Sequence, residues 1–191
     1  FHLYEIGTLQ MVHSGIITPI HELTDWEPIN WDDFFSPVHS YYIVDGKHYS
    51  MPFNSSTPLL YYNKTMFEQA GLDPESPPET FAEVVEYAET LQAEIPELKA
   101  PITWNLHSWY FEQFHCLMDE PFVNNDNGRK GVLPTEAVFN GEAGQQILEW
   151  WTGMEEDGLF LDVGPGWQNH RAAFGSGEVA MVMSSTSDVN Q

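Results

Sequence analysis

Polar side chains suited to hydrogen bonding run directly into an apolar strand in the segment from Ser50 to Lys64. Asn54, Ser55 and Ser56 offer both donors and acceptors, and the apolar run Thr57 to Tyr61 follows them. This order of polar turn, strand and helix is typical of a ligand cleft built where a chain crosses between two lobes. A simple turn is the alternative, because Asn and Ser side chains also bond their own backbone.

The elements that must hold this segment alternate between strands and helices, which indicates an α/β fold. The clearest helix starts at Thr80, since Thr80 and Glu83 form a capping box and apolar residues recur at helical spacing as far as Ile95. Strands are expected at 1–4 (buried), 41–44, 48–51, 57–61, 101–104 and 178–183, and further helices at 8–14, 31–35, 63–70, 107–118, 141–156 and 168–174. Asp45-Gly46 predicts a hairpin turn, and residues 124–131 a polar turn.

The net charge of −23 limits the possible partners. It arises from 29 acidic and 6 basic residues, and such a field repels nucleic acid and anionic membrane surfaces. High salt screens this self-repulsion, so the composition favours a protein of a halophile. The carboxylates are spread along the whole chain and are expected to form a solvated surface.

Cysteine and histidine usage gives no sign of a metal or a cofactor. Cys116 is the single cysteine, so no internal disulfide is possible, and we expect it to be a small buried apolar residue. The 8 histidines are scattered without the spacing of a zinc site. The sequence also lacks a nucleophile elbow, a phosphate loop and a dinucleotide fingerprint, and it has no apolar run of membrane-spanning length.

The motif PFNSSTPxLYYNK at Pro52 to Lys64 resembles the interlobe crossing of the extracytoplasmic solute-binding proteins of ABC importers, above all those that bind glycerol 3-phosphate. Three further segments carry the same resemblance: 4–8 (YEIGT), 70–81 with its AGLDP and PPETF, and 174–181 with its F-x-x-G-x-x-A-M pattern. The likeness therefore extends over nearly the whole chain.

The resemblance implies a type II periplasmic-binding-protein-like fold, with helices packed on both faces of mixed sheets. Residues 1–55 are expected to be the remainder of an N-terminal lobe, 56–184 the bulk of a C-terminal lobe, and 185–191 the start of a return crossing. We therefore expect a fragment, with both termini of the full protein missing.

Ligand contacts implied by the resemblance fall on Glu5, Ser56 and Ser185, with aromatic cover from Trp104 or Trp109. Tyr4, Ser55 and Thr186, which lie beside these positions, complete the candidate set. A carboxylate can bond vicinal hydroxyls, and charge-assisted bonds are the stronger kind. Two alternatives remain open: Glu5 can be a carboxylate favoured near a helix N-terminus, and either tryptophan can be a core residue.

The implied function is that of a receptor that closes two lobes over a small polar solute, namely glycerol 3-phosphate, a glycerophosphodiester or a sugar. Its partners are expected to be ABC permease subunits, and the receptor itself a monomer, not an enzyme, located outside the cytoplasm either in a periplasm or on the cell surface as a lipoprotein. The alternative is a glycosidase using paired carboxylates, although no pair stands out among the 29 acidic residues.

Overall fold

The computed structural model describes residues 2–23, 29–128 and 132–190. Its contacts divide the chain into two compact units, hereafter unit 1, built around Phe1–Ser55, and unit 2, built around Ser56–Gly128 and Leu133–Gln191. The assignment of 1–55 and 56–184 to two lobes, and of 185–191 to a return crossing, stays a prediction.

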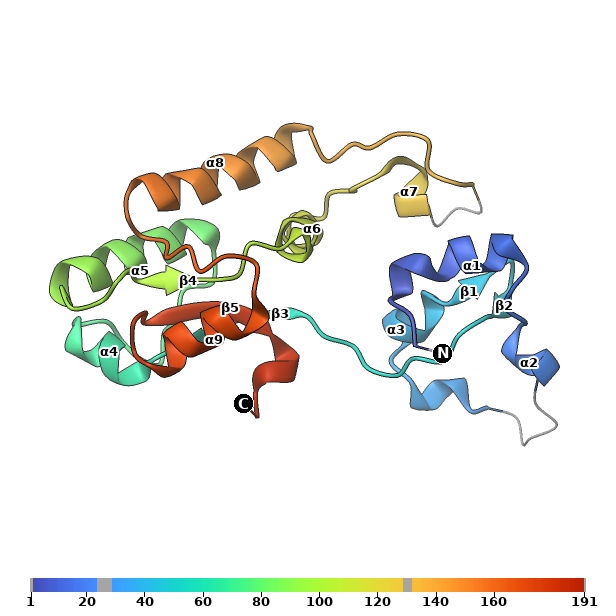
Figure 1. Ribbon diagram of the computed structural model, residues 1–191, viewed down its shortest axis with the longest axis horizontal. Coiled ribbons are helices and arrows are strands. Elements are labelled where there is room, and N and C mark those ends of the chain that lie inside the picture. Colours follow the sequence, from blue (N-terminus) through green and yellow to red (C-terminus); the bar gives the residue numbers. More distant parts are fainter. Residues whose placement is uncertain (1, 24–28, 129–131, 191) are drawn as a thin grey trace. The chain divides into compact units, whose positions relative to one another are not determined.

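Unit 1 consists of short helices and one small hairpin (Figure 1). Its elements are η1 (Glu5–Gly7), α1 (Thr8–Ser14), α2 (Ile20–Leu23), η2 (Trp31–Asp33), α3 (Ser36–Ser40), β1 (Ile43–Val44) and β2 (Lys47–His48). β1 and β2 pair in antiparallel fashion around Asp45 and Gly46, which both have positive φ angles of 50° and 73°. Two such residues are what a two-residue hairpin turn requires, so the predicted hairpin is confirmed, with shorter strands.

Two predictions for unit 1 are wrong. The described residues of the expected N-terminal strand form no strand, and Tyr4 is 80% exposed instead of buried. An apolar run becomes a strand only beside a partner, and β1 and β2 pair with each other. The helix expected at 31–35 is the shorter 3-10 turn η2, and the sequence did not predict the short helices α2 and α3.

Unit 2 is built on a mixed three-stranded sheet. The strands are β3 (Pro58–Tyr62), β4 (Ile102–Thr103) and β5 (Met181–Ser185), in the order β3-β5-β4. β5 pairs antiparallel to β3 and parallel to β4. Side chains alternate along β5, so that Met181 and Met183 join the main apolar core while Ser184 contacts the helix on the opposite face.

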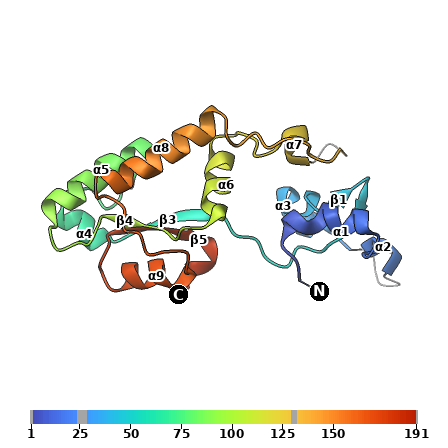
Figure 2. The ribbon, with the colours of Figure 1, turned by 45° about the horizontal axis from the view of Figure 1, so that its top comes forward.

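Helices cover both faces of this sheet, as predicted. They are α4 (Lys64–Gln69), α5 (Phe81–Glu94), α6 (Ser108–Leu117), α8 (Glu142–Glu156) and α9 (Trp167–Gly175). Figure 2 shows α5 and α8 on one side of the sheet and α9 on the other. The main core lies on the side of α5 and α8, where Phe67, Leu91, Phe114 and Met154 are buried.

The helix starts in unit 2 confirm the capping signals in the sequence. The Thr80 hydroxyl accepts the N–H of Glu83 at 3.1 Å, and the Glu83 carboxylate accepts the N–H of Thr80 at 3.0 Å. Asn63 caps α4 by accepting the N–H of Met66 at 3.2 Å. These bonds satisfy backbone donors that the first helical turn leaves free.

The prediction that Cys116 is buried is wrong. Helix α6 turns Tyr110, Phe114 and His115 inward, and this leaves the next residue, Cys116, exposed. The turn expected at 124–131 is present over its described part, labelled α7 (Asn124–Gly128). Its residues Asn125 to Asn127 have left-handed φ angles between 52° and 57°, so it is a turn and not a right-handed helix.

Candidate ligand-binding site

One edge of the sheet in unit 2 gathers the chain segments that carry most of the candidate residues. β4 and β5 are parallel, so both end at this edge, and β3 is antiparallel, so it begins there. Pro58 is paired with Ser185, which places Ser56 and Thr186 beside the same strand ends. In open α/β sheets, ligands bind outside the carboxyl ends of the strands.

Thr57 and Thr186 join the two chain segments that pass this edge. The N–H of Thr186 donates to the carbonyl of Thr57 at 2.9 Å, and the N–H of Thr57 donates to the Thr186 hydroxyl at 3.2 Å. Ser56 precedes this pair and is exposed, so its hydroxyl is accessible to a solute.

Ser185 is buried, and its hydroxyl already has partners. It accepts the N–H of Ser187 at 3.0 Å and lies 2.8 Å from the Ser187 hydroxyl, and so caps the 3-10 turn η3 (Thr186–Asp188). Its carbonyl accepts the Tyr61 hydroxyl at 2.8 Å. The contacts of Ser185 therefore fix the end of β5, and the half-exposed Thr186 is the more accessible of the two.

The two candidate tryptophans lie in different surroundings. Trp104 is completely buried: it stacks on Trp150 at 5.3 Å between ring centroids and contacts Phe160 at 4.3 Å. No face of its indole ring is open to a solute. Trp109 is the second residue of helix α6, is half-buried, and meets Trp167 edge to face at 5.7 Å.

Trp167 is a residue that the sequence analysis missed. It is the first residue of α9, it is half-buried, and its ring stacks on that of Tyr110 at 6.0 Å. Trp109 and Trp167 together provide aromatic surface of the kind on which the C–H face of a sugar or polyol can pack. The turn Gly164-Pro165-Gly166 just before Trp167 was the available signal.

Tyr4, Glu5 and Ser55 belong to unit 1. Glu5 is the exposed first residue of η1, and its charge adds to burial in raising the pKa of Tyr42. Tyr4 and Ser55 are exposed as well. The structure thus groups Ser56, Trp109, Ser185 and Thr186 within unit 2.

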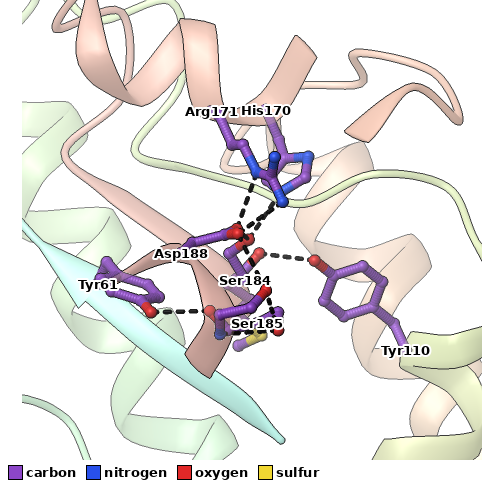
Figure 3. Close-up of polar contacts among 9 residues, drawn as sticks. Tyr61, Tyr110, His170, Arg171, Ser184, Ser185 and Asp188 are labelled. Atoms are coloured by element: carbon purple, nitrogen blue, oxygen red, sulfur yellow. Dashed lines mark hydrogen bonds and ion pairs between the residues drawn. The ribbon is translucent and has the colours of Figure 1, made fainter. Parts of the chain in front are cut away.

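The sequence analysis also missed a polar network between α9 and the end of β5 (Figure 3). Arg171 of α9 binds Asp188 with two nitrogens, Nε to Oδ2 at 2.9 Å and Nη2 to Oδ1 at 2.5 Å. The Ser184 hydroxyl donates to Asp188 and lies 2.9 Å from Nε2 of His170. Since this hydroxyl donates to a carboxylate, its oxygen accepts the proton of Nε2, which assigns the tautomer of His170.

The titratable groups around this network favour their neutral forms. Burial, reinforced by the positive charge of Arg171, lowers the pKa of His170. Burial raises the pKa of Tyr110, whose hydroxyl donates to the carbonyl of Met183 at 2.8 Å. Burial, with the negative charge of Asp188, likewise raises the pKa of Tyr61. The two tyrosine hydroxyls donate to backbone carbonyls of β5, and His170 contacts β5 through the Ser184 hydroxyl.

Over residues 2–23, 29–128 and 132–190, no group of three or more His, Cys, Asp or Glu side chains is arranged to hold a metal ion. Within those same ranges, the helices are too short or too polar to cross a membrane.

Comparison with known proteins assigns this chain to a family of solute-binding proteins. The family described as "Bacterial extracellular solute-binding protein" matches residues 6–191, and the chain belongs to it. This membership confirms the family predicted from Pro52 to Lys64 and gives no support to the alternative of a glycosidase.

Two curated relatives are named as the sn-glycerol-3-phosphate-binding periplasmic protein UgpB. The protein of Salmonella paratyphi A is 38% identical over 150 residues, which cover 76% of this chain and 33% of the relative. The protein of Escherichia coli K12 is 36% identical over 169 residues, which cover 85% of this chain and 37% of the relative. The chain therefore spans only about a third of the length of these relatives.

Solved structures share the fold at lower identity. UgpB from Mycobacterium tuberculosis in complex with glycerophosphocholine gives a TM-score of 0.73 at 22% identity, covering 94% of this chain and 44% of that one. The sugar-binding protein MalE from Xanthomonas citri gives a TM-score of 0.72 at 21% identity and covers 95% of this chain and 44% of its own. Both comparisons confirm the predicted α/β fold class.

Proposed function

We propose that the complete protein is the extracytoplasmic receptor of an ABC importer and captures a small polar solute by closing two lobes over it. Membership of the solute-binding family supports this function. The observation that carries it is the Thr57–Thr186 pair, because it holds the segment before β3 beside the segment after β5 at the candidate site of unit 2. Closure would work by population shift, since contacts from both lobes form only in the shut state.

The solute we propose is glycerol 3-phosphate, a glycerophosphodiester or a sugar. The chain is 36–38% identical to proteins named for glycerol 3-phosphate, and a structural relative is described in complex with glycerophosphocholine. The exposed Ser56 and half-exposed Thr186 supply hydroxyl groups, and Trp109 and Trp167 supply aromatic surface. We propose that Glu5 adds a carboxylate acceptor from unit 1, with Tyr4 and Ser55 beside it.

The proposal includes a monomeric receptor that delivers its solute to ABC permease subunits outside the cytoplasm and catalyses no reaction. The relatives named as periplasmic support this location. A lipid anchor and a halophilic source remain predictions from the sequence alone.

Isothermal titration calorimetry on the complete protein tests the function. The panel contains glycerol 3-phosphate, glycerophosphocholine, maltose and trehalose, and each solute is also recovered and analysed for turnover. We expect saturable binding of at least one solute with no product formed. Absence of binding across the panel contradicts the proposed solutes, and turnover of any of them contradicts a receptor.

A further inference from the structure

The Arg171–Asp188 ion pair differs from the other ion pairs of unit 2 in burial and geometry. Its side chains are 22% and 7% exposed, and the guanidinium meets both carboxylate oxygens. By comparison, Lys99 and Glu178 form a single contact of 2.8 Å with side chains 58% and 36% exposed. Bidentate ion pairs removed from solvent constrain side-chain geometry far more than exposed pairs do. Exposed ion pairs contribute little to stability.

The carboxylate of Asp188 joins three parts of unit 2. It receives Arg171 from α9, the hydroxyl of Ser184 from β5, and the hydroxyl of Ser187 at 3.3 Å from its own turn. His170, one residue before Arg171, supports Ser184 from the same helix at 2.9 Å. The turn η3 is thereby held against α9.

Thr186 lies between this ion pair and the start of β3. It is the first residue of η3, the turn that Asp188 ends, and its backbone and hydroxyl both bond Thr57. The turn is therefore anchored to β3 at its first residue and to α9 at its last. Without the anchor to α9, Thr186 would be held only by its two hydrogen bonds to Thr57.

We infer that Arg171 and Asp188 are positioning residues of the solute site, which fix the orientation of Thr186 and the adjoining Ser56–Thr57 segment without binding solute themselves. The inference rests on the proposed function for its effect on affinity. Its structural part, the fixing of Thr186, stands on the contacts of unit 2 alone.

The test compares Asp188→Asn with Glu178→Gln in the complete protein. Each substitution removes one negative charge with almost no change in shape. The control pair lies at the opposite end of β5, where the N–H of Lys99 donates to the carbonyl of Glu178. For the solute that the wild type binds, we expect Asp188→Asn to raise Kd about tenfold and Glu178→Gln to leave it unchanged. Arg171→Lys keeps the positive charge but loses the bidentate contact, so its Kd is expected to lie between those of Asp188→Asn and Glu178→Gln.

Amide hydrogen exchange gives a second measurement that needs no solute. The Thr186 amide, which donates to Thr57, is expected to exchange about tenfold faster in Asp188→Asn than in the wild type. The Lys99 amide serves as the internal reference and is expected to keep its rate. Arg171→Lys takes the place of Asp188→Asn in both measurements if the latter does not fold.

The outcomes separate this inference from the proposed function. The inference is overturned if Asp188→Asn lowers the melting temperature but changes neither the Kd nor the exchange rate of the Thr186 amide. The ion pair would then serve only stability. If the wild type binds none of the panel, the proposed function fails, and the exchange rate of Thr186 alone decides whether the ion pair positions that residue.

Discussion

The N–H of Thr186 donates to the carbonyl of Thr57, and the N–H of Thr57 donates back to the Thr186 hydroxyl, at 2.9 and 3.2 Å. The two residues continue the register of β3 and β5 one step beyond Pro58 and Ser185. A side-chain oxygen here takes the place of the carbonyl acceptor that a regular ladder would use. The hydroxyl of Thr186 is therefore both part of the sheet edge and a candidate solute contact.

Replacing Thr186 by Val removes that hydroxyl at nearly constant volume. We expect a loss of about 1 kcal/mol in the free energy of unfolding, since Thr57 loses its acceptor, together with weaker solute binding. Denaturant unfolding and calorimetry on the complete protein measure the two effects. Thr186→Ser keeps the hydroxyl and is the control; equal behaviour of both variants would show that the hydroxyl has no such role.

Glu5→Gln is expected to weaken solute binding about tenfold, which corresponds to about 1.4 kcal/mol, because a charged acceptor becomes a neutral one. The matched control is Asp32→Asn, which removes the same charge from an exposed turn of unit 1. Calorimetric titrations of both variants separate a local contact from the general effect of the net charge. An affinity unchanged by Glu5→Gln removes Glu5 from the site.

The two tryptophans are expected to respond differently to substitution. Trp109→Ala should weaken solute binding and lower the melting temperature less than Trp104→Ala does, because Trp109 is only partly buried at the side of the core. Trp104→Ala should cost about 3–5 kcal/mol of stability, since it leaves a cavity among Trp150 and Phe160. Thermal melts and titrations report both quantities, and unchanged affinity in Trp109→Ala would assign that ring to packing.

The capping box of α5 predicts a stability effect that is independent of function. Thr80→Ala removes the acceptor of the Glu83 N–H and is expected to cost about 1 kcal/mol in unfolding free energy. Thr90 lies inside the same helix, where its hydroxyl bonds only the carbonyl of Glu86. Thr90→Ala is therefore the control, and chemical denaturation should show a clear difference between the two variants.

The lowered pKa of His170 predicts a contribution to the pH dependence of stability. Unfolded His170 takes up its proton near pH 6.5, whereas the buried ring resists protonation, so the unfolded state binds more protons. Its contribution to the free energy of unfolding is therefore present above about pH 6.5 and is lost as the pH falls below that value. His170→Gln should therefore reduce the change in melting temperature between pH 7 and pH 5. A pH dependence equal to that of the wild type would contradict a buried, neutral His170.

Local signals made much of unit 2 predictable. The helix from Phe81 is defined by a capping box and apolar periodicity, and β3 by a short apolar run that follows polar residues. In unit 1, the Asp45-Gly46 hairpin likewise follows from two adjacent residues that tolerate positive φ. In each case the cause lies within a few residues of the effect.

Contacts between distant segments could not be predicted in the same way. Arg171 and Asp188 are 17 residues apart and meet only because α9 packs on β5, and Trp104 is buried by rings from α6 and α8. The N-terminal strand was expected from composition alone, although a strand also needs a partner. Ser56, Ser185 and Thr186 lie at the ends of β3 and β5, and their contact with a solute stays a prediction. The Arg171–Asp188 ion pair beside them was missed.

Pro58 pairs with Ser185, and the adjoining residues Thr57 and Thr186 are 129 positions apart in the sequence. Pairing β3 with β5 therefore closes a long loop, which costs more chain entropy than forming a local hairpin such as that of β1 and β2. Contacts between distant segments slow folding, so we expect the ladder of β3 and β5 to form after the helices and turns of unit 2.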